Sequence, residues 1–290
     1  MTKSLNKYII LLGSDNVKRI IYRILAYIID ILLVTLLTFG LTYLPCFKNT
    51  NQKVGAYYVS LSTNEAMYNN LINILDDYYE DAKISESEMA EINDKYANYA
   101  KCFKDIKVEE EVTNKMKSDI ETNIKKTYVD TKNNVSYEIN KCNVSQSIIG
   151  IVLYILYFGV FQYFMKGQTL GKKLFRLKVK KCDDSKVSLL SYIIRSILVC
   201  EILITGLDLI FLLTMNRSMY VTSNYWILQV KYIYEILFIV VMIIRDDNRS
   251  VHDLLLNTCV VRMDKEGNEI KEQLFEEKNE KNEKNINKTN

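Results

Sequence analysis

Apolar residues along this chain fall into four long blocks, which are separated by strongly polar segments. The first block, residues 24–44, contains one charged residue, Asp30. As a helix rising 1.5 Å per residue, this block would be about 30 Å long, which is enough to cross the hydrocarbon core of a bilayer. The pattern therefore predicts an all-α membrane protein.

The other blocks predict three more spans, giving a four-span helical bundle. The first span covers about 20–45 and ends at Pro45, the only proline in the chain. The remaining spans cover about 147–165, 188–214 and 225–244. The mean hydropathy of −0.05 resembles that of a soluble protein only because long polar segments dilute the apolar blocks.

Loop charges predict how the spans are oriented. The loop 166–187 carries eight basic residues against two acidic ones, whereas the loop 215–224 has a single basic residue. Because basic loops stay in the cytoplasm, 166–187 is expected there. The basic lead 1–19 and the tail 264–290 are then also cytoplasmic, and 46–146 is external.

The external insertion 46–146 is predicted to be helical. Ser85 and Glu88 form a capping box that opens one helix. Apolar residues recur at helical spacing in three stripes: Met67, Leu71, Ile74, Leu75 and Tyr78; Met89, Ile92, Tyr96, Tyr99 and Phe103; and Val112, Met116, Ile120, Ile124 and Tyr128. These stripes predict a small helical bundle.

Two cytoplasmic runs are expected to be extended. Residues 174–180 approach alternation of apolar and basic positions, and residues 258–263 are β-prone, so a small cytoplasmic sheet can join them. The membrane domain would then occupy 147–263. The tail 264–290 is rich in Glu, Lys and Asn and is predicted to be disordered.

Six cysteines occur without CxxC spacing, which argues against a zinc or redox motif. Cys46, Cys102 and Cys142 lie in the external insertion, where whether two of them form a disulfide stays open. No pattern predicts a metal site or a cofactor, and the chain is not expected to be an enzyme.

Three segments, in order, resemble one family. They are Arg23-Ile-Leu-Ala-Tyr-Ile-Ile-Asp30, then Gly167-Gln-Thr-Leu-Gly171 with the basic run after it, then Arg249-Ser-Val-His252-Asp253 continuing to Val261. The chain is similar to the RDD family of bacterial multi-pass membrane proteins, named for an Arg and two Asp. The resemblance covers about 20–45 and 147–262. It implies a bacterial cell-membrane location, suspected ion transport, and Arg23, Asp30 and Asp253 as the family motif.

Charges inside the spans are expected to be paired, because an isolated charge in lipid is costly. Asp30 and Arg195 lie at similar depth, so Asp30 is predicted to pair with Arg195 first and with Arg23 second. Asp208 and Lys231 both fall in the outer third of their spans and are predicted to form another buried pair.

Glu201 and Glu235 lie near mid-depth, and they are the candidate site for an ion or a proton. Two acids close together in a low dielectric cannot both stay ionised, so one could exchange a proton for a cation. Alternatively, they accept hydrogen bonds from hydroxyl groups, or Lys231 pairs with Glu235 four residues away, and the charges only fix helix packing.

Three other features are predicted to have structural or lipid-contacting roles rather than catalytic ones. His252, the only histidine, lies beside Asp253 and is expected to make a contact in the cytoplasmic cap. Gly167 and Gly171 are expected to permit close approach of the backbone. The basic run 172–181 favours contact with anionic lipid headgroups rather than with nucleic acid.

The leading functional hypothesis is transport or binding of a small ion or solute, with a monovalent cation or a proton as partner. The alternative is a non-transporting membrane scaffold or sensor whose external segment binds a partner. Deleting 46–146 separates the two, because a transporting core would keep its flux and a sensor would lose its response.

Overall fold

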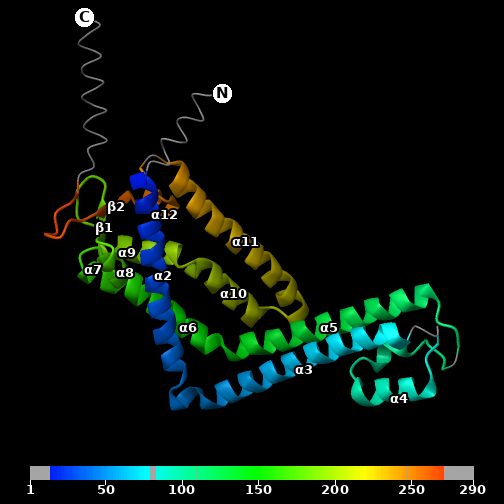
Figure 1. The fold of residues 1–290 in the computed structure, drawn as a ribbon. Coiled ribbons are helices and arrows are strands. Elements are labelled where there is room, and N and C mark those ends of the chain that lie inside the picture. The colour runs from blue at the N-terminus through cyan, green and yellow to red at the C-terminus, as the bar shows by residue number, and fades with distance from the viewer. Residues whose placement is uncertain (1–13, 79–82, 109, 246, 271–290) are drawn as a thin grey trace, which may run out of the picture. The chain divides into compact units, whose positions relative to one another are not determined.

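The membrane-spanning part of the chain is helical, as predicted (Figure 1). The computed structural model describes residues 14–78, 83–108, 110–245 and 247–270. Most of the predicted lead and of the predicted disordered tail lie outside the described residues.

Three helical stretches of the described chain are long and apolar enough to cross a membrane. The first is helix α2, Ser14–Thr42, and the last is α11, Arg217–Ile244. The second begins as α6, Val144–Tyr154, then continues through a π-helical segment, Ile155–Phe161, and the short α7, Gln162–Phe164. Apolar side chains cover much of their surface, which fits a lipid environment.

The third predicted span, 188–214, is broken rather than continuous. Its halves are α9, Leu189–Val199, and α10, Ile202–Thr214, and they bend by 63° at the break. Glu201 has a φ of 52° there, in the left-handed region that L-residues with side chains rarely adopt. Helix α11 begins at Arg217, so the connection after α10 is also far shorter than the predicted loop 215–224.

A small antiparallel sheet forms where the sequence predicts one. Strand β1, Leu177–Lys181, pairs with β2, Thr258–Arg262, with Leu177 opposite Arg262 and Lys181 opposite Thr258. Two short helices precede the strands: α8, Leu170–Leu174, and α12, Val251–Leu255.

The chain forms two compact units. The first contains residues 1–40, 148–206 and 228–290, and the second contains 41–147 and 207–227. In the first unit, both strands and α2 contribute to an apolar cluster made of Ala26, Leu177, Val179, Tyr192 and Val260.

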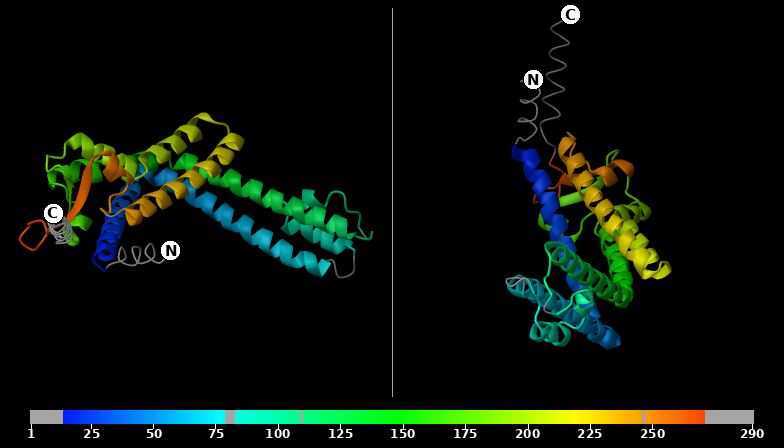
Figure 2. Two further views of the ribbon diagram at one scale, coloured as in Figure 1. Left: turned by 90° about the horizontal axis from the view of Figure 1, so that it is seen from above. Right: turned by 90° about the vertical axis from the view of Figure 1, so that its right-hand side faces the viewer.

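The second unit contains the insertion, whose long helices are α3, Lys48–Tyr78, and α5, Asn114–Cys142. They run antiparallel and side by side (Figure 2). The shorter α4, Glu86–Lys95, opens at Ser85 and Glu88 with the predicted capping box. Single helical turns occur at Pro45–Phe47 and Ala100–Phe103.

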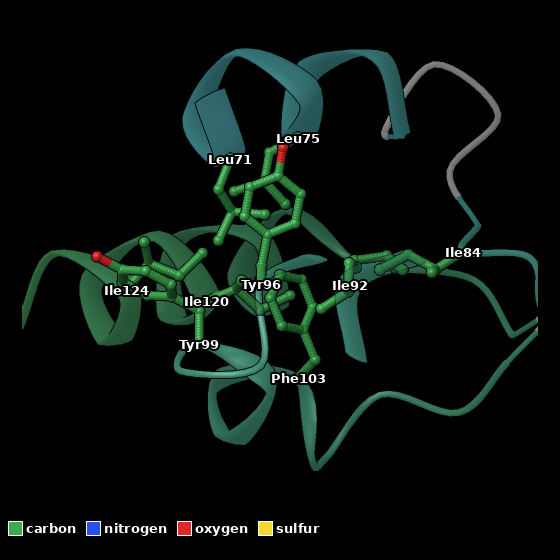
Figure 3. Packing of buried hydrophobic residues seen from close by; sticks show 10 residues of the cluster. Leu71, Leu75, Ile84, Ile92, Tyr96, Tyr99, Phe103, Ile120 and Ile124 are labelled. Carbon is green, nitrogen blue, oxygen red and sulfur yellow. The ribbon is translucent and has the colours of Figure 1, made fainter. Parts of the chain in front are cut away.

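The predicted apolar stripes meet in one core of the second unit (Figure 3). The buried members are Leu71, Leu75, Ile84, Ile92, Tyr96, Tyr99, Phe103, Val112, Ile120 and Ile124. A separate cluster of Tyr137, Leu212 and Tyr220 lies in the same unit. All six cysteines are free thiols, so no disulfide joins Cys46, Cys102 or Cys142 in this structure.

Candidate functional site

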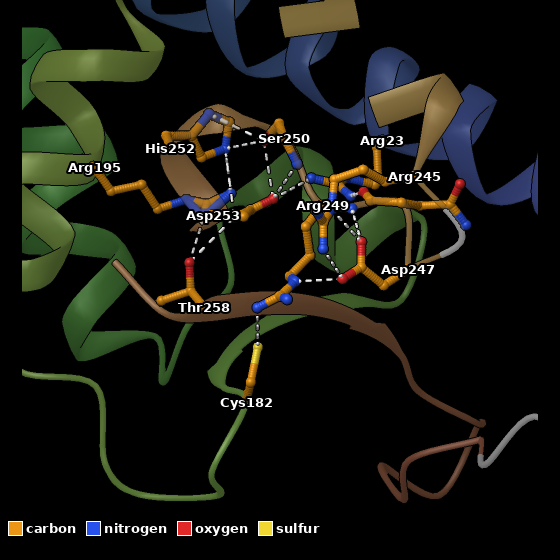
Figure 4. A network of polar contacts seen from close by, with 11 residues as sticks. Arg23, Cys182, Arg195, Arg245, Asp247, Arg249, Ser250, His252, Asp253 and Thr258 are labelled. Carbon is orange, nitrogen blue, oxygen red and sulfur yellow. Dashed lines mark hydrogen bonds and ion pairs between the residues drawn. The ribbon is translucent and has the colours of Figure 1, made fainter. Parts of the chain in front are cut away.

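A buried polar cap surrounds Asp253 in the first unit (Figure 4). Asp253 lies on α12 with none of its surface exposed. Its Oδ2 accepts a hydrogen bond from Arg23 Nη2 at 2.5 Å, and its Oδ1 accepts one from Arg195 Nη1 at 2.6 Å. Ser250 Oγ and Thr258 Oγ1 also donate to the carboxylate, at 3.0 and 3.2 Å. Four side chains thus donate hydrogen bonds to one acid.

The partners of Asp253 keep it ionised. Burial by itself raises the pKa of a carboxyl group, but the charges of Arg195 and Arg23 and the Ser250 hydroxyl together hold the pKa of Asp253 well below its usual range. Two guanidinium groups share one carboxylate, so removing the carboxylate would leave two buried positive charges without it.

His252 completes the polar cap, as expected for a cap contact. Its Nε2 lies 2.9 Å from Arg195 Nη2. A guanidinium group can only donate, so this ring nitrogen accepts and the imidazole is neutral. Burial, together with the charge of Arg195, lowers the pKa of His252 well below its usual value. The ring also stacks on Phe238 of α11, with 5.2 Å between centroids.

Asp30 does not pair with Arg195 or Arg23, so the predicted ion pair is wrong: both guanidinium groups bind Asp253. Asp30 is fully buried on α2 and accepts hydrogen bonds from Tyr157 Oη and the Gly171 backbone N–H, both at 2.7 Å. The Thr169 hydroxyl also donates to it. Asp30 therefore binds the first turn of α8, and uncharged donors satisfy it.

The glycines of the segment before β1 allow this approach. A Cβ on Gly171 would lie 2.2 Å from the Ala26 carbonyl oxygen, and a Cβ on Gly167 would lie 2.3 Å from the Val179 carbonyl oxygen. Gly167 also has a φ of 94°. Close backbone approach is thus the role that the structure gives to both residues.

Lys231 has other partners than the predicted Asp208. Its Nζ lies 3.4 Å from Glu201 Oε2 and 4.0 Å from Glu235 Oε1. Asp208 instead accepts a hydrogen bond from Tyr220 Oη at 3.5 Å. Glu201 and Glu235 therefore come together, as the sequence suggested, but with a shared lysine between them.

Two tyrosines hold the break that carries Glu201. Breaking a helix leaves backbone carbonyl groups without helical partners. Tyr27 of α2 donates to the Val199 carbonyl at 2.9 Å, and Tyr234 of α11 donates to the Leu198 carbonyl at 2.7 Å. The break is thus a satisfied part of the fold, tied to two neighbouring helices.

A cavity of about 560 Å³ connects these groups. Helix α2 lines it with Arg23 and Asp30, and helix α11 lines it with Lys231 and Glu235. Glu201 at the break also borders it, and several aromatic rings complete the wall. The motif residues on α2 and the candidate acids therefore face the same space.

Lys172 of α8 is a lining residue that sequence reasoning missed. Its Nζ donates to Gln162 Oε1 at 3.2 Å and lies 5.7 Å from the centroid of the Phe158 ring. Although the side chain borders the cavity, its ammonium group is surrounded by protein. This burial, with the charge of Arg195, lowers the pKa of Lys172 to about 7. The only sequence signal was its place in a basic run.

The cavity, the broken span and the apolar helices define an integral membrane protein. Residues 129–257, a little under half of the chain, match the model of the RDD family, so this region is similar to RDD-family membrane proteins. The matched region includes Asp253 and the broken span, whereas Arg23 and Asp30 precede it. No curated protein and no solved structure matches the chain.

Proposed function

We propose that the first unit binds a small ion or solute in its cavity and moves it across the cell membrane. The observation that carries this proposal is the broken span, whose break places Glu201 beside Lys231 and Glu235 at the cavity wall. Interrupted membrane helices are tolerated where they line a cavity, and transporters use such interruptions to bind substrates. The proposal gives the chain no catalytic role.

The charges in the cavity suit exchange of a proton for a monovalent cation. A lysine with a pKa of about 7, such as Lys172, is present both with and without its proton at neutral pH. The ammonium group of Lys231 lies near the carboxylates of both Glu201 and Glu235. A cation that bound Glu235 would therefore compete with this ammonium group. The volume of the cavity also admits a hydrated ion or a small organic solute.

Glu201→Gln and Glu235→Gln are each expected to abolish pH-coupled flux while leaving membrane insertion intact. Glutamine keeps the size of the side chain but lacks the negative charge with which Glu201 and Glu235 attract Lys231 or a cation. The measurement is uptake of cations into liposomes that contain the purified protein, with an imposed pH gradient and a panel of monovalent cations.

Glu65→Gln supplies the matched control, because Glu65 is an exposed acid on α3 of the second unit. It should transport at the rate of the unchanged protein. Full flux in both cavity variants would remove Glu201 and Glu235 from the mechanism.

The location proposed with this function is the cell membrane, with both termini in the cytoplasm. The loop charges support this orientation. In a variant without native cysteines, an impermeant maleimide applied to intact cells should label Thr63→Cys in the insertion and spare Ser185→Cys in the loop after β1. Both positions are exposed in the structure. Labelling at Ser185→Cys alone would show that the protein has the opposite orientation.

A further inference from the structure

Two cysteines meet on one face of the small sheet. Cys259 in β2 is opposite Lys180, and Cys182, directly after β1, donates its backbone N–H to the Asn257 carbonyl at 3.1 Å. Positions two residues apart on a strand share a face, so the two cysteines are diagonal neighbours on the same side. The side chains of Cys259 and Cys182 are close enough to interact on this face.

The two thiols have different surroundings. Cys182 is exposed, and Arg249 Nη1 donates a hydrogen bond to its sulfur at 3.4 Å (Figure 4). Asp247 Oδ2 holds the same guanidinium group through Nε at 2.7 Å, which fixes its position. A neighbouring cation favours the thiolate, the form of cysteine that reacts.

Cys259 is more enclosed. Burial, together with its contact to Cys182, raises the pKa of the Cys259 thiol to about 12. An exposed thiol beside a cation and a protonated thiol next to it match the roles of an attacking cysteine and a resolving cysteine.

We propose that Cys182 and Cys259 form a redox-active pair that a hydroperoxide oxidises to a disulfide. In the first step the Cys182 thiolate attacks one oxygen of hydrogen peroxide and the O–O bond breaks. Cys182 becomes a sulfenic acid, and the leaving hydroxide takes up a proton to give water. In the second step the Cys259 sulfur attacks the sulfenic sulfur, the disulfide forms, and a second water leaves. Two molecules of a small thiol reverse the reaction.

This modification would affect the polar cap. Thr258, next to Cys259, donates to Asp253 and accepts a hydrogen bond from Arg195. A disulfide would tie β2 to the end of β1 and take the Cys182 sulfur away from Arg249. The inference does not depend on transport, because the thiol chemistry can be measured without a flux assay.

The test uses the purified full-length protein. After treatment with hydrogen peroxide, peptide mapping by mass spectrometry should show Cys182 linked to Cys259, and dithiothreitol should reverse the link. In Cys259→Ser, a sulfenic acid should persist at Cys182 and be trapped by dimedone. Exposed Cys46 is the internal reference: under native conditions Cys182 should react with iodoacetamide faster than Cys46 does.

Arg249→Gln tests the role of the guanidinium group. The alkylation rate of Cys182 in this variant should fall by roughly threefold or more, because the sulfur loses the hydrogen bond and the positive charge that favour a reactive thiolate. Arg249→Lys, which keeps a positive charge, should restore part of the rate. Either of two results would overturn the proposal: no peptide joining Cys182 to Cys259, or Cys182 reacting no faster than Cys46.

Discussion

Replacing Asp253 with alanine is expected to lower the free energy of unfolding by roughly 3–5 kcal/mol, the usual cost of removing one partner from a buried ion pair. The cost arises because Arg195 and Arg23, with side chains only 6% and 11% exposed, would lose the carboxylate that both of them bind. The measurement is unfolding of the purified protein in mixed micelles as the fraction of denaturing detergent rises.

Asp183→Ala is the matched control, because Asp183 is an exposed acid in the loop after β1. A surface substitution of this kind usually changes stability by about 0.5 kcal/mol or less. If Asp253→Ala cost no more than the control, the polar cap would not contribute to holding the first unit together.

The contribution of Asp253 also has a defined dependence on pH. The folded protein holds the pKa of this carboxyl well below its unfolded value of about 3.9. A depressed pKa contributes stability above the unfolded pKa, and that stability is lost as the pH falls through the folded pKa. The free energy of unfolding should therefore differ between the unchanged protein and Asp253→Asn by a constant amount at neutral pH. This difference should become smaller only in strong acid.

Local patterns in the sequence predicted the elements of the fold. The capping box at Ser85 and the stripe that includes Ile92 depend only on residues a few positions apart, and both occur as predicted. The same is true of the small sheet, whose two runs are extended by their own composition.

The partners of the buried charges could not be predicted from depth alone. Asp30 and Arg195 lie at similar depth along their helices, but depth does not say which side of a helix faces which neighbour. The segment after α7 also brings Thr169 and Gly171 back to Asp30, and these uncharged donors replace the expected arginine.

The break in the third span had no local signal. Neither proline nor glycine stands at Cys200 or Glu201, which are the residues between α9 and α10. The break depends instead on tyrosine hydroxyl groups from two other helices, Tyr27 and Tyr234, which satisfy the freed carbonyl groups. Such a tertiary cause is invisible to a pattern read along one segment.

Gly171→Ala is expected to destabilise the protein strongly, because the new methyl group would lie 2.2 Å from the Ala26 carbonyl oxygen and 2.9 Å from Asp30 Oδ1. Neither neighbour is the far end of a flexible side chain, since Ala26 belongs to the backbone of α2 and Asp30 is held by three donors. Helix α8 would have to move away from α2, which would break the hydrogen bond from the Gly171 N–H to Asp30.

Overpacking commonly costs about 1–3 kcal/mol, and leaving the buried backbone N–H of residue 171 without an acceptor costs about 1–3 kcal/mol more, so a total of roughly 2–6 kcal/mol is expected. Gly206→Ala is the matched control: Gly206 lies inside α10, and no atom of the described residues outside the adjacent helix backbone lies within 4 Å of the added methyl group. That change should be neutral or slightly stabilising, because alanine favours a helix more than glycine does. Equal unfolding midpoints for the two variants would show that α8 has room to move and that the contact between Gly171 and α2 is not required for the fold.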